Sequence, residues 1–296
     1  MPVIAKQKIT PRPVIRSKRP ETREEKMISA LSPTLNVMVN AVRRVGKNIV
    51  HDFREVSNLQ ISEKGPGDFV SNADLYAEKK LIEFLHEARP DYGFLSEECG
   101  KIAGAKGCDY TFVLDPIDGT NNFIHALPIF AISVALVKAE KVIAGVVFNP
   151  VTNELYYAEK GKGAFLMTPT GNVRLRVSGR RQLKNCLFAT NGYSSERTQK
   201  GLKGIAKEFA SGRYLGSAAL SLSMVAMGQI DAEFEFKFHK WDIAAAYLLI
   251  QEAGGKISTF DGNSDLDAIV KSSTLLAANP VLHAMLLPKM AKSLMK

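Results

Sequence analysis

The sequence has little cysteine and no long apolar run, and each shortage excludes a class of protein. Its three cysteines, Cys99, Cys108 and Cys186, form no Cys-x-x-Cys pair. An odd number without paired spacing excludes a disulfide framework or a thiolate zinc site as the basis of the fold, and it favours a reducing compartment. No apolar run reaches the roughly 18 residues that a membrane helix needs. Because no secretory signal peptide is evident either, we expect a cytoplasmic protein without a membrane partner.

Charge is in clear excess only near the start of the chain. The net charge is +9, and residues 1–26 contribute more than half of it, with eight basic and three acidic residues. The rest of the chain is mildly basic, which is weak support for nucleic-acid binding. The same segment holds four prolines and few large apolar residues, so burial cannot offset its ordering entropy. We expect a disordered basic arm over residues 1–26, either inert or in contact with nucleic acid.

Hydrophobic periodicity divides the remainder of the chain near residue 182. Apolar residues recur at helical spacing over residues 33–53 and 73–88, and short segments separated by turn residues follow. This order predicts an α+β domain over residues 27–182 with a largely antiparallel sheet, followed by an α/β domain over residues 183–296. The expected strands are 111–114, 131–137, 142–148, 154–158, 173–177, 187–190, 232–236, 257–260 and 275–278, and the later helices are 196–210, 218–227, 243–253 and 281–295.

The segment Leu-Asp-Pro-Ile-Asp-Gly-Thr at residues 114–120 carries the strongest chemical signal. Pro116 lacks the N–H that would continue a ladder, so we expect the apolar strand to end beside it. Asp115 and Asp118 then project from one tight turn, where they repel each other unless a cation lies between them. Such oxygen ligands suit Mg²⁺, and a helix starting just after them would add an anion site. The alternative is that both aspartates are ordinary turn formers.

Three further acidic residues stand at entries to loops or helices. Glu97 follows a short apolar strand, and Asp74 stands at the entry of the helix expected over residues 73–88. Asp242 follows Trp241 and precedes an apolar helix. Taken singly, Asp74 and Asp242 would be plain N-caps. Together with the two aspartates of the turn, they form a candidate set of metal ligands.

Four ordered segments, residues 68–78, 94–100, 113–134 and 216–255, resemble the inositol monophosphatase family of Mg²⁺-dependent, lithium-sensitive sugar phosphatases. The resemblance is greatest to bacterial members, the extragenic-suppressor branch included, and it covers residues 27–296. The combination of Asp-Pro-Ile-Asp-Gly-Thr-x-Asn-Phe with Trp-Asp-x-Ala-Ala and Glu-Ala-Gly-Gly is highly specific. It implies the layered αβαβα sandwich that this family shares with fructose-1,6-bisphosphatases, and a homodimer.

The resemblance also implies two or three Mg²⁺ ions in each site. Thr120 and Asp74 would orient and deprotonate the attacking water, and Glu97 would also support a weaker third ion. Two metal ions clamp the attacking and leaving oxygens of an in-line displacement, so no covalent intermediate is expected. The implied ligands of the first ion are Glu97, Asp115 and the carbonyl of Ile117, and those of the second are Asp115, Asp118 and Asp242.

The expected substrate is a small phosphate ester that two parts of the chain contact. By resemblance, the N–H groups of Gly119 and Thr120 would hold the phosphate. Glu235 has an alternative interpretation as the outward residue of an alternating strand. The residues that match the family's contacts to sugar or inositol hydroxyls are Gly216, Ser217, Ala218 and Glu235.

Inositol-1-phosphate is the leading substrate prediction, and several alternatives stay open. Asn121 and Asn122 argue against the nucleotide-phosphatase branch, whereas histidinol phosphate and fructose-1,6-bisphosphate are harder to exclude. Lys240 adds a positive charge beside the expected site, which would favour a more anionic substrate. Because some bacterial family members act in ribosomal RNA transcription, contact with RNA polymerase or RNA is the alternative from another class.

Overall fold

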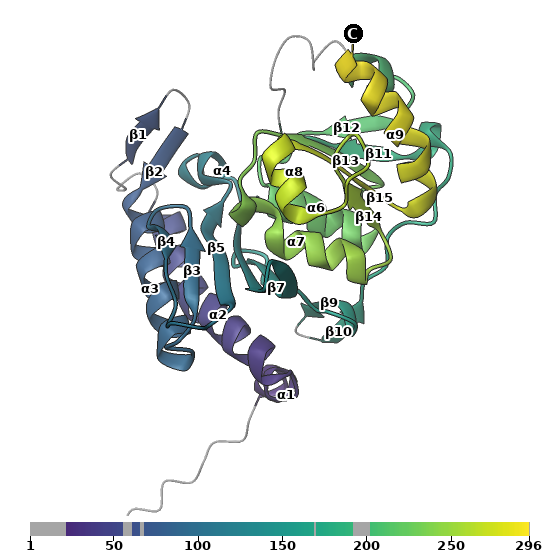
Figure 1. Ribbon diagram of the computed structural model, residues 1–296. Coiled ribbons are helices and arrows are strands. Elements are labelled where there is room, and N and C mark those ends of the chain that lie inside the picture. Colours follow the sequence, from purple (N-terminus) through teal and green to yellow (C-terminus); the bar gives the residue numbers. More distant parts are fainter. Residues whose placement is uncertain (1–21, 56–60, 66–67, 169, 192–201, 296) are drawn as a thin grey trace, which may run out of the picture.

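Helices and sheets alternate in layers (Figure 1). The computed structural model describes residues 22–295, apart from 56–60, 66–67, 169 and 192–201. Within this part of the chain, no helix combines the length and the apolar character needed to span a bilayer.

Two sheets and three helical layers form the αβαβα sandwich that the resemblance implied. Helices α2 (Pro33–Arg54) and α3 (Asn72–Ala88) pack on one face of an eight-stranded sheet. Helices α6 (Ala218–Met227) and α7 (Lys240–Glu252) lie between this sheet and a five-stranded sheet. Helix α9 (Pro280–Met295) covers the outer face of the second sheet (Figure 1). The predicted fold class is therefore confirmed.

The eight-stranded sheet is largely antiparallel, as the sequence predicts. Its parallel pair is β3 with β5. Both of its faces are covered by helices, so nearly every residue of its central strands is buried. Its strands, in spatial order, are β10 (Gly171–Arg174), β9 (Gly163–Thr168), β8 (Glu154–Glu159), β7 (Lys141–Asn149), β6 (Ala131–Lys138), β5 (Tyr110–Asp118), β3 (Gly93–Ser96) and β4 (Gly100–Ile102).

The five-stranded sheet is mixed. Strand β11 runs parallel to both of its neighbours, and the other pairs are antiparallel. Helix α8 (Leu266–Ser272) packs beside α7, and a separate hairpin joins β1 (Ile61–Gly65) to β2 (Asp68–Ser71). The strands, in spatial order, are β12 (Ser211–Arg213), β11 (Leu187–Ala189), β13 (Ala232–Phe236), β15 (Thr274–Ala278) and β14 (Lys256–Ser258).

Many of the predicted helices and strands are present, but some bounds differ and several elements were not predicted. Helix α6 and strand β13 have the predicted bounds. Strand β10 begins two residues before the strand expected at 173–177, and the intervening β9 and the later α8 were not predicted. The helix expected over residues 196–210 lies partly outside the described residues, and its described turns end at residue 206.

The first described helix overlaps the end of the predicted arm. Residues 1–21 lie outside the described residues, but α1 (Arg23–Ser29) occupies the end of the segment expected to be disordered. A capping box starts this helix, because Thr22 Oγ1 accepts from the N–H of Glu25 and Glu25 Oε2 accepts from the N–H of Thr22. Ile28 is buried against α2. Local capping and one apolar anchor thus order residues that composition alone assigned to the arm.

The predicted boundary at residue 182 falls between the last strand of the large sheet and the first strand of the small one. Helices α6 and α7 nevertheless share one apolar core with strands of the large sheet. The division into two domains therefore stays a prediction.

Gly145 on β7 lies against the backbone of α7. A Cβ at this position would lie 2.7 Å from the carbonyl oxygen of Ala245, and backbone cannot yield as a side chain can. We expect Gly145→Ala to lower the free energy of unfolding by about 1–3 kcal/mol, measured by urea titration. Gly179→Ala, whose Cβ would meet nothing within 4 Å, is the control. Equal stability of the two variants would contradict this packing.

Candidate active site

The strand that leads to the candidate site does not end at Pro116 as predicted. β5 continues to Asp118, and its pairing with β6 shifts register between Asp115, opposite Ser133, and Asp118, opposite Ala131. One extra residue on β5 is thus taken up in a bulge, which accommodates a residue without an N–H. Bulges re-aim side chains, so this irregularity sets where the two aspartates lie.

Sheet register brings Glu97 and Asp242 to the same place. β3 and β5 run in parallel with Ser96 opposite Leu114, so Glu97 follows β3 beside Asp115. On the other side, Ser133 donates from its hydroxyl to the carbonyl oxygen of Trp241 at 3.1 Å. Because Ser133 is opposite Asp115 on β6, this bond anchors the first turn of α7 beside the bulge.

Asp115 is the electrostatic centre of the site. It is only 2% exposed, and burial is the main cause that raises the pKa of its carboxyl well above the ordinary value. The negative charges of nearby carboxylates raise that pKa further. Oδ1 accepts a hydrogen bond from the N–H of Ile117 at 2.9 Å. The carboxylates that act on Asp115 are Glu97, Asp118, Asp242 and Asp74, the set that the sequence predicts.

Asp118 joins the bulge to the N-terminus of α6. It accepts hydrogen bonds from the hydroxyl of Ser217 at 2.5 Å and from the N–H groups of Ala219 and Ala218 at 2.7 and 3.3 Å. Burial outweighs these bonds and raises the pKa of Asp118 to about 6. Asp118, a predicted metal ligand, therefore directly contacts residues 217–219, which overlap the segment predicted to bind substrate hydroxyls.

Gly119 and Thr120 form the turn after β5. Gly119 has a left-handed φ of 104°, and a Cβ there would lie 3.0 Å from the carbonyl oxygen of Ile129 and 3.1 Å from that of Gly216. Glycine is therefore required by both conformation and space. The hydroxyl of Thr120 donates to the carbonyl oxygen of Ile117 at 3.1 Å, at the start of α4 (Thr120–Ile124).

Asp242 lies inside α7 rather than at its N-cap. His239 is the N-cap, and its N–H donates to Asp242 Oδ2 at 2.6 Å. Burial and the charge of Asp118 raise the pKa of Asp242 well above the ordinary value. Lys240 pairs with Asp267 on α8 at 2.6 Å, so its charge is partly neutralised there rather than free to favour a more anionic substrate.

Sequence reasoning missed Glu78, which shapes the loop that carries Glu97. Glu78 is fully buried on α3 and accepts hydrogen bonds from the hydroxyl of Ser96 and the N–H groups of Glu98 and Cys99, at 2.9, 2.9 and 2.6 Å. The available signal was an acidic residue on the buried face of an amphipathic helix. Such a residue needs partners, and the nearby loop supplies them.

Glu235 is buried rather than outward-facing. All five residues of β13 are buried, because helices cover both faces of the small sheet. Glu235 Oε1 accepts from the N–H of Asn191 at 2.8 Å, and Asn191 Oδ1 accepts from the N–H of Gly216 at 2.7 Å. Asn191, which the sequence did not single out, thereby links two of the predicted substrate contacts.

The donor set fits Mg²⁺ by its chemistry. Carboxylate and carbonyl oxygens are hard ligands, and a divalent cation would remove the mutual repulsion around Asp115. Across the described residues, no group of three or more His, Cys, Asp or Glu side chains already forms a metal-holding cluster. Asp115, Asp118 and Asp242 instead accept hydrogen bonds from local donors. An ionised carboxylate has about four lone-pair sites on its two oxygens, so these hydrogen bonds leave room for a cation.

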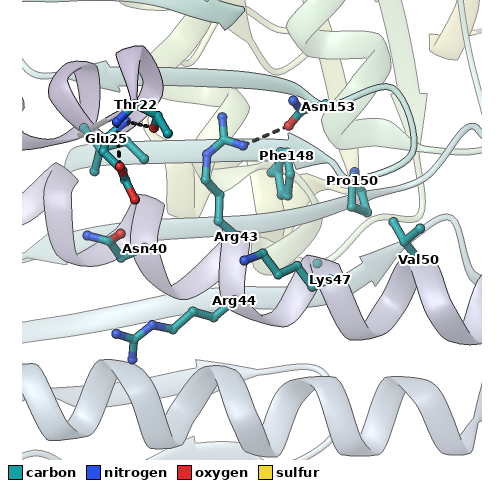
Figure 2. A pocket seen from close by; sticks show the side chains of 12 residues that line it. Thr22, Glu25, Asn40, Arg43, Arg44, Lys47, Val50, Phe148, Pro150 and Asn153 are labelled. Atoms are coloured by element: carbon teal, nitrogen blue, oxygen red, sulfur yellow. Dashed lines mark hydrogen bonds between the residues drawn. The ribbon is translucent and has the colours of Figure 1, made fainter. Parts of the chain in front are cut away.

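A hollow lies away from these carboxylates, between α1, α2 and the turn that follows β7 (Figure 2). Arg43 extends across it and donates to Asn153 Oδ1 at 2.8 Å, with its guanidinium 5.1 Å from the ring centroid of Phe148. None of the predicted site residues lines this hollow. Through these two contacts, Arg43 attaches α2 to the large sheet.

Comparison with known proteins places this chain in a family. The model of the inositol monophosphatase family matches residues 30–295. An inositol-1-monophosphatase of Caulobacter vibrioides is 44% identical over 86% of this chain and 99% of its own length. A Nus factor SuhB of Pasteurella multocida is 35% identical over 84% of this chain and 92% of its own. The crystal structure of extragenic suppressor protein suhB from Bartonella henselae superposes with a TM-score of 0.83 at 40% identity, covering 88% of this chain and 99% of that one. With its carboxylates gathered on this fold, the chain belongs to the inositol monophosphatase family.

Proposed function

We propose that this protein is a Mg²⁺-dependent phosphomonoesterase that hydrolyses inositol-1-phosphate and related sugar or polyol monophosphates. The observation that carries the proposal is the buried carboxylate of Asp115, on which four further carboxylates act. A buried group of like charges is costly unless a cation neutralises it. The family and the relatives named inositol-1-monophosphatase support a phosphate ester as the substrate.

The proposed metal sites use oxygens from the turn after β3, from β5 and from α7. Glu97, Asp115 and the Ile117 carbonyl would hold one ion, with Glu97 also serving a weaker third. When bound, Mg²⁺ neutralises phosphate charge and lowers the pKa of the attacking water. The second ion would be held by Asp115, Asp118 and Asp242.

The chain's own groups would then bind and orient the reactants. The N–H groups of Gly119 and Thr120 hold the phosphate at the start of α4. The hydroxyl of Thr120 and the carboxylate of Asp74 orient the attacking water, and Asp74 takes its proton. The phosphoryl group goes directly to water. Contacts to the alcohol come from Gly216, Ser217, Ala218 and Glu235.

A panel of phosphate esters tests this proposal. Phosphate release is measured from inositol-1-phosphate, glycerol-2-phosphate, histidinol phosphate, fructose-1,6-bisphosphate and 3′-phosphoadenosine-5′-phosphate, each with Mg²⁺, with EDTA, and with Mg²⁺ plus Li⁺. We expect turnover only with Mg²⁺, inhibition by Li⁺, and the highest kcat/KM for inositol-1-phosphate. A higher kcat/KM for another ester would contradict inositol-1-phosphate as the preferred substrate. Turnover undiminished by EDTA would contradict a Mg²⁺-dependent mechanism.

A second candidate function is contact with the transcription machinery. Relatives that are 35% identical over most of this chain are named Nus factor SuhB. If no ester of the panel releases phosphate, this candidate is favoured, in which the chain binds RNA polymerase or RNA. For either function we propose a homodimer.

A further inference from the structure

The peptide unit that joins Leu215 to Gly216 is held by hydrogen bonds at both ends. Its carbonyl oxygen, on Leu215, accepts from Asn122 Nδ2 at 2.7 Å. Its N–H, on Gly216, donates to Asn191 Oδ1 at 2.7 Å. One asparagine therefore acts as a donor and the other as an acceptor. If the peptide unit turned over, Asn122 would face an N–H and Asn191 a carbonyl oxygen, and both bonds would be lost.

Each asparagine makes a further hydrogen bond, which fixes the end of its amide that faces the peptide unit. Asn122 Nδ2 also donates to the carbonyl oxygen of Ile129 at 2.6 Å, so both hydrogens of its amide are used. Asn191 Nδ2 donates to Ser221 Oγ at 3.3 Å, which leaves Oδ1 to accept from Gly216. Neither amide can turn over to match a reversed peptide unit without losing a bond.

The backbone at Gly216 does not fix this orientation by itself. Gly216 has a left-handed φ of 74° and is exposed. Glycine adopts positive and negative φ about equally readily, so the preceding peptide unit is free to rotate unless something holds it. The amide of Asn122 covers the glycine, since a Cβ on Gly216 would lie 2.8 Å from Asn122 Nδ2. The two asparagines thus supply the restraint that the glycine lacks.

The asparagine pair joins the two halves of the proposed substrate site. Asn122 lies on α4, the helix that begins at Thr120. Asn191 lies just beyond β11, and its own N–H donates to Glu235 Oε1 at 2.8 Å. The peptide unit between them therefore connects the proposed phosphate-binding turn with a proposed contact to the alcohol.

The orientation of this peptide unit sets the direction of the chain that follows it. The carbonyl oxygen of Gly216 lies close to the metal turn, because a Cβ on Gly119 would be 3.1 Å from it. The next residue, Ser217, is the N-cap of α6 and donates from its hydroxyl to Asp118. Residues 216–218 are thus placed against the metal turn by a peptide unit whose orientation depends on two side chains.

We propose that Asn122 and Asn191 are positioning residues that align the alcohol-binding segment 216–218 with the phosphate-binding turn. This inference rests on the proposed function. The pair acts on binding of the alcohol rather than on phosphoryl transfer, because neither side chain is a proposed ligand of a metal ion or of the attacking water. It makes the site selective for esters whose alcohol bears further hydroxyl groups, since misaligned polar groups leave those hydroxyls unmatched.

Alanine variants of the two asparagines, alone and combined, test the proposal by kinetics. Each single variant should raise KM for inositol-1-phosphate about tenfold, with a change in kcat below about threefold. KM for 4-nitrophenyl phosphate, whose leaving group has no further hydroxyl, should stay within about twofold. Because both residues hold one peptide unit, the double variant should lose about tenfold rather than about a hundredfold. Asn172→Ala, exposed on the edge strand β10, is the control.

Solvent exchange of the Gly216 N–H tests the restraint without any substrate. Gly216 is exposed, so its hydrogen bond to Asn191 should dominate the protection of this N–H. In the isotope-labelled full-length protein, exchange measured by NMR should be about tenfold faster or more in Asn191→Ala. It should also be faster in Asn122→Ala, although Asn122 contacts only the carbonyl at the other end of the peptide unit.

The outcomes separate this inference from the proposed function. It is supported if KM rises for inositol-1-phosphate alone, if the two effects do not multiply, and if both variants speed exchange at Gly216. It is overturned if the effects multiply in the double variant, if 4-nitrophenyl phosphate is affected equally, or if Asn122→Ala leaves exchange unchanged. Should Asn122→Ala fail to fold, the KM values of Asn191→Ala for the two esters decide the question. A natural protein that releases phosphate from neither ester would instead reject the proposed function, whatever the exchange rates.

Discussion

Replacing Asp115 by Asn should abolish Mg²⁺-dependent phosphate release without destabilising the metal-free protein. Asp115 is the proposed bridge between two ions, and loss of a residue that merely supports a ligand already costs about 10–100-fold in metal affinity or activity. We therefore expect phosphate release to fall by at least about a hundredfold. Asn has nearly the same shape and keeps an oxygen that can accept from the N–H of Ile117.

The pH dependence of stability follows from the raised pKa of Asp115. Its ordinary value in an unfolded chain is about 3.9. Because the folded state holds the proton more tightly, the stabilising contribution is fully present below that value and is lost as pH rises through the folded-state pKa. In EDTA, Tm of the natural protein should therefore fall between acidic and neutral pH. Tm of Asp115→Asn should fall less over the same range.

Mg²⁺ should reverse this loss of stability in the natural protein but not in Asp115→Asn. A ligand at a hundred times its dissociation constant stabilises by about 2.7 kcal/mol, which corresponds to roughly 5 °C or more in Tm. Asp109→Asn, at the exposed start of the same strand region, is the control and should respond to Mg²⁺ as the natural protein does. An Asp115→Asn variant that retains the Mg²⁺ shift or the turnover would refute the assignment of this carboxylate.

The sequence predicts the site's acidic residues better than it predicts their surroundings. Asp115, Asp118 and Asp242 stand in short specific motifs, and the register of β3, β5 and β6 explains why they converge. Pro116 was expected to terminate a strand, but a bulge absorbs it, and a bulge depends on pairing with a partner strand that local sequence does not reveal.

The residues that sequence reasoning missed are those whose role depends on contacts between distant segments. Asn122 stands in the most specific motif of the chain, yet its partner Leu215 is 93 positions away. Asn191 likewise contacts Gly216 and Glu235 across 25 and 44 positions of the chain. Burial of both faces of β13 depends on helices outside the strand, α6 before it and α9 after it, so alternation alone could not place Glu235.

Glu78→Ala should produce the second large effect, on both stability and metal affinity. Glu78 is fully buried, and its removal leaves the N–H groups of Glu98 and Cys99 and the hydroxyl of Ser96 without their acceptor. Unsatisfied buried groups cost about 1–3 kcal/mol each, so we expect the free energy of unfolding to fall by about 3–5 kcal/mol. The concentration of Mg²⁺ that gives half-maximal activity should rise about 10–100-fold, because this loop carries Glu97.

The matched control for Glu78→Ala is Glu83→Ala on the same helix. Glu83 is exposed and forms an ion pair with Lys80, three residues before it, so its loss should have little effect on stability or on Mg²⁺ activation. Both measurements use the full-length chain, by urea titration and by phosphate release over a range of Mg²⁺ concentrations. Equal behaviour of the two variants would contradict a role for Glu78 in shaping the loop.

The thiol of Cys99 reports on the same loop independently of activity. The hydrogen bond with Glu78 is the largest cause that raises the pKa of Cys99 to about 11, followed by burial. A thiol with a raised pKa holds little reactive thiolate, so Cys99 of the natural protein should be alkylated slowly by iodoacetamide. Glu78→Ala removes the main cause of the shift and should speed alkylation of Cys99 relative to Cys108. If that ratio stays unchanged while Mg²⁺ activation is lost, Glu78 acts on the metal site by a route other than the Glu97–Cys99 loop.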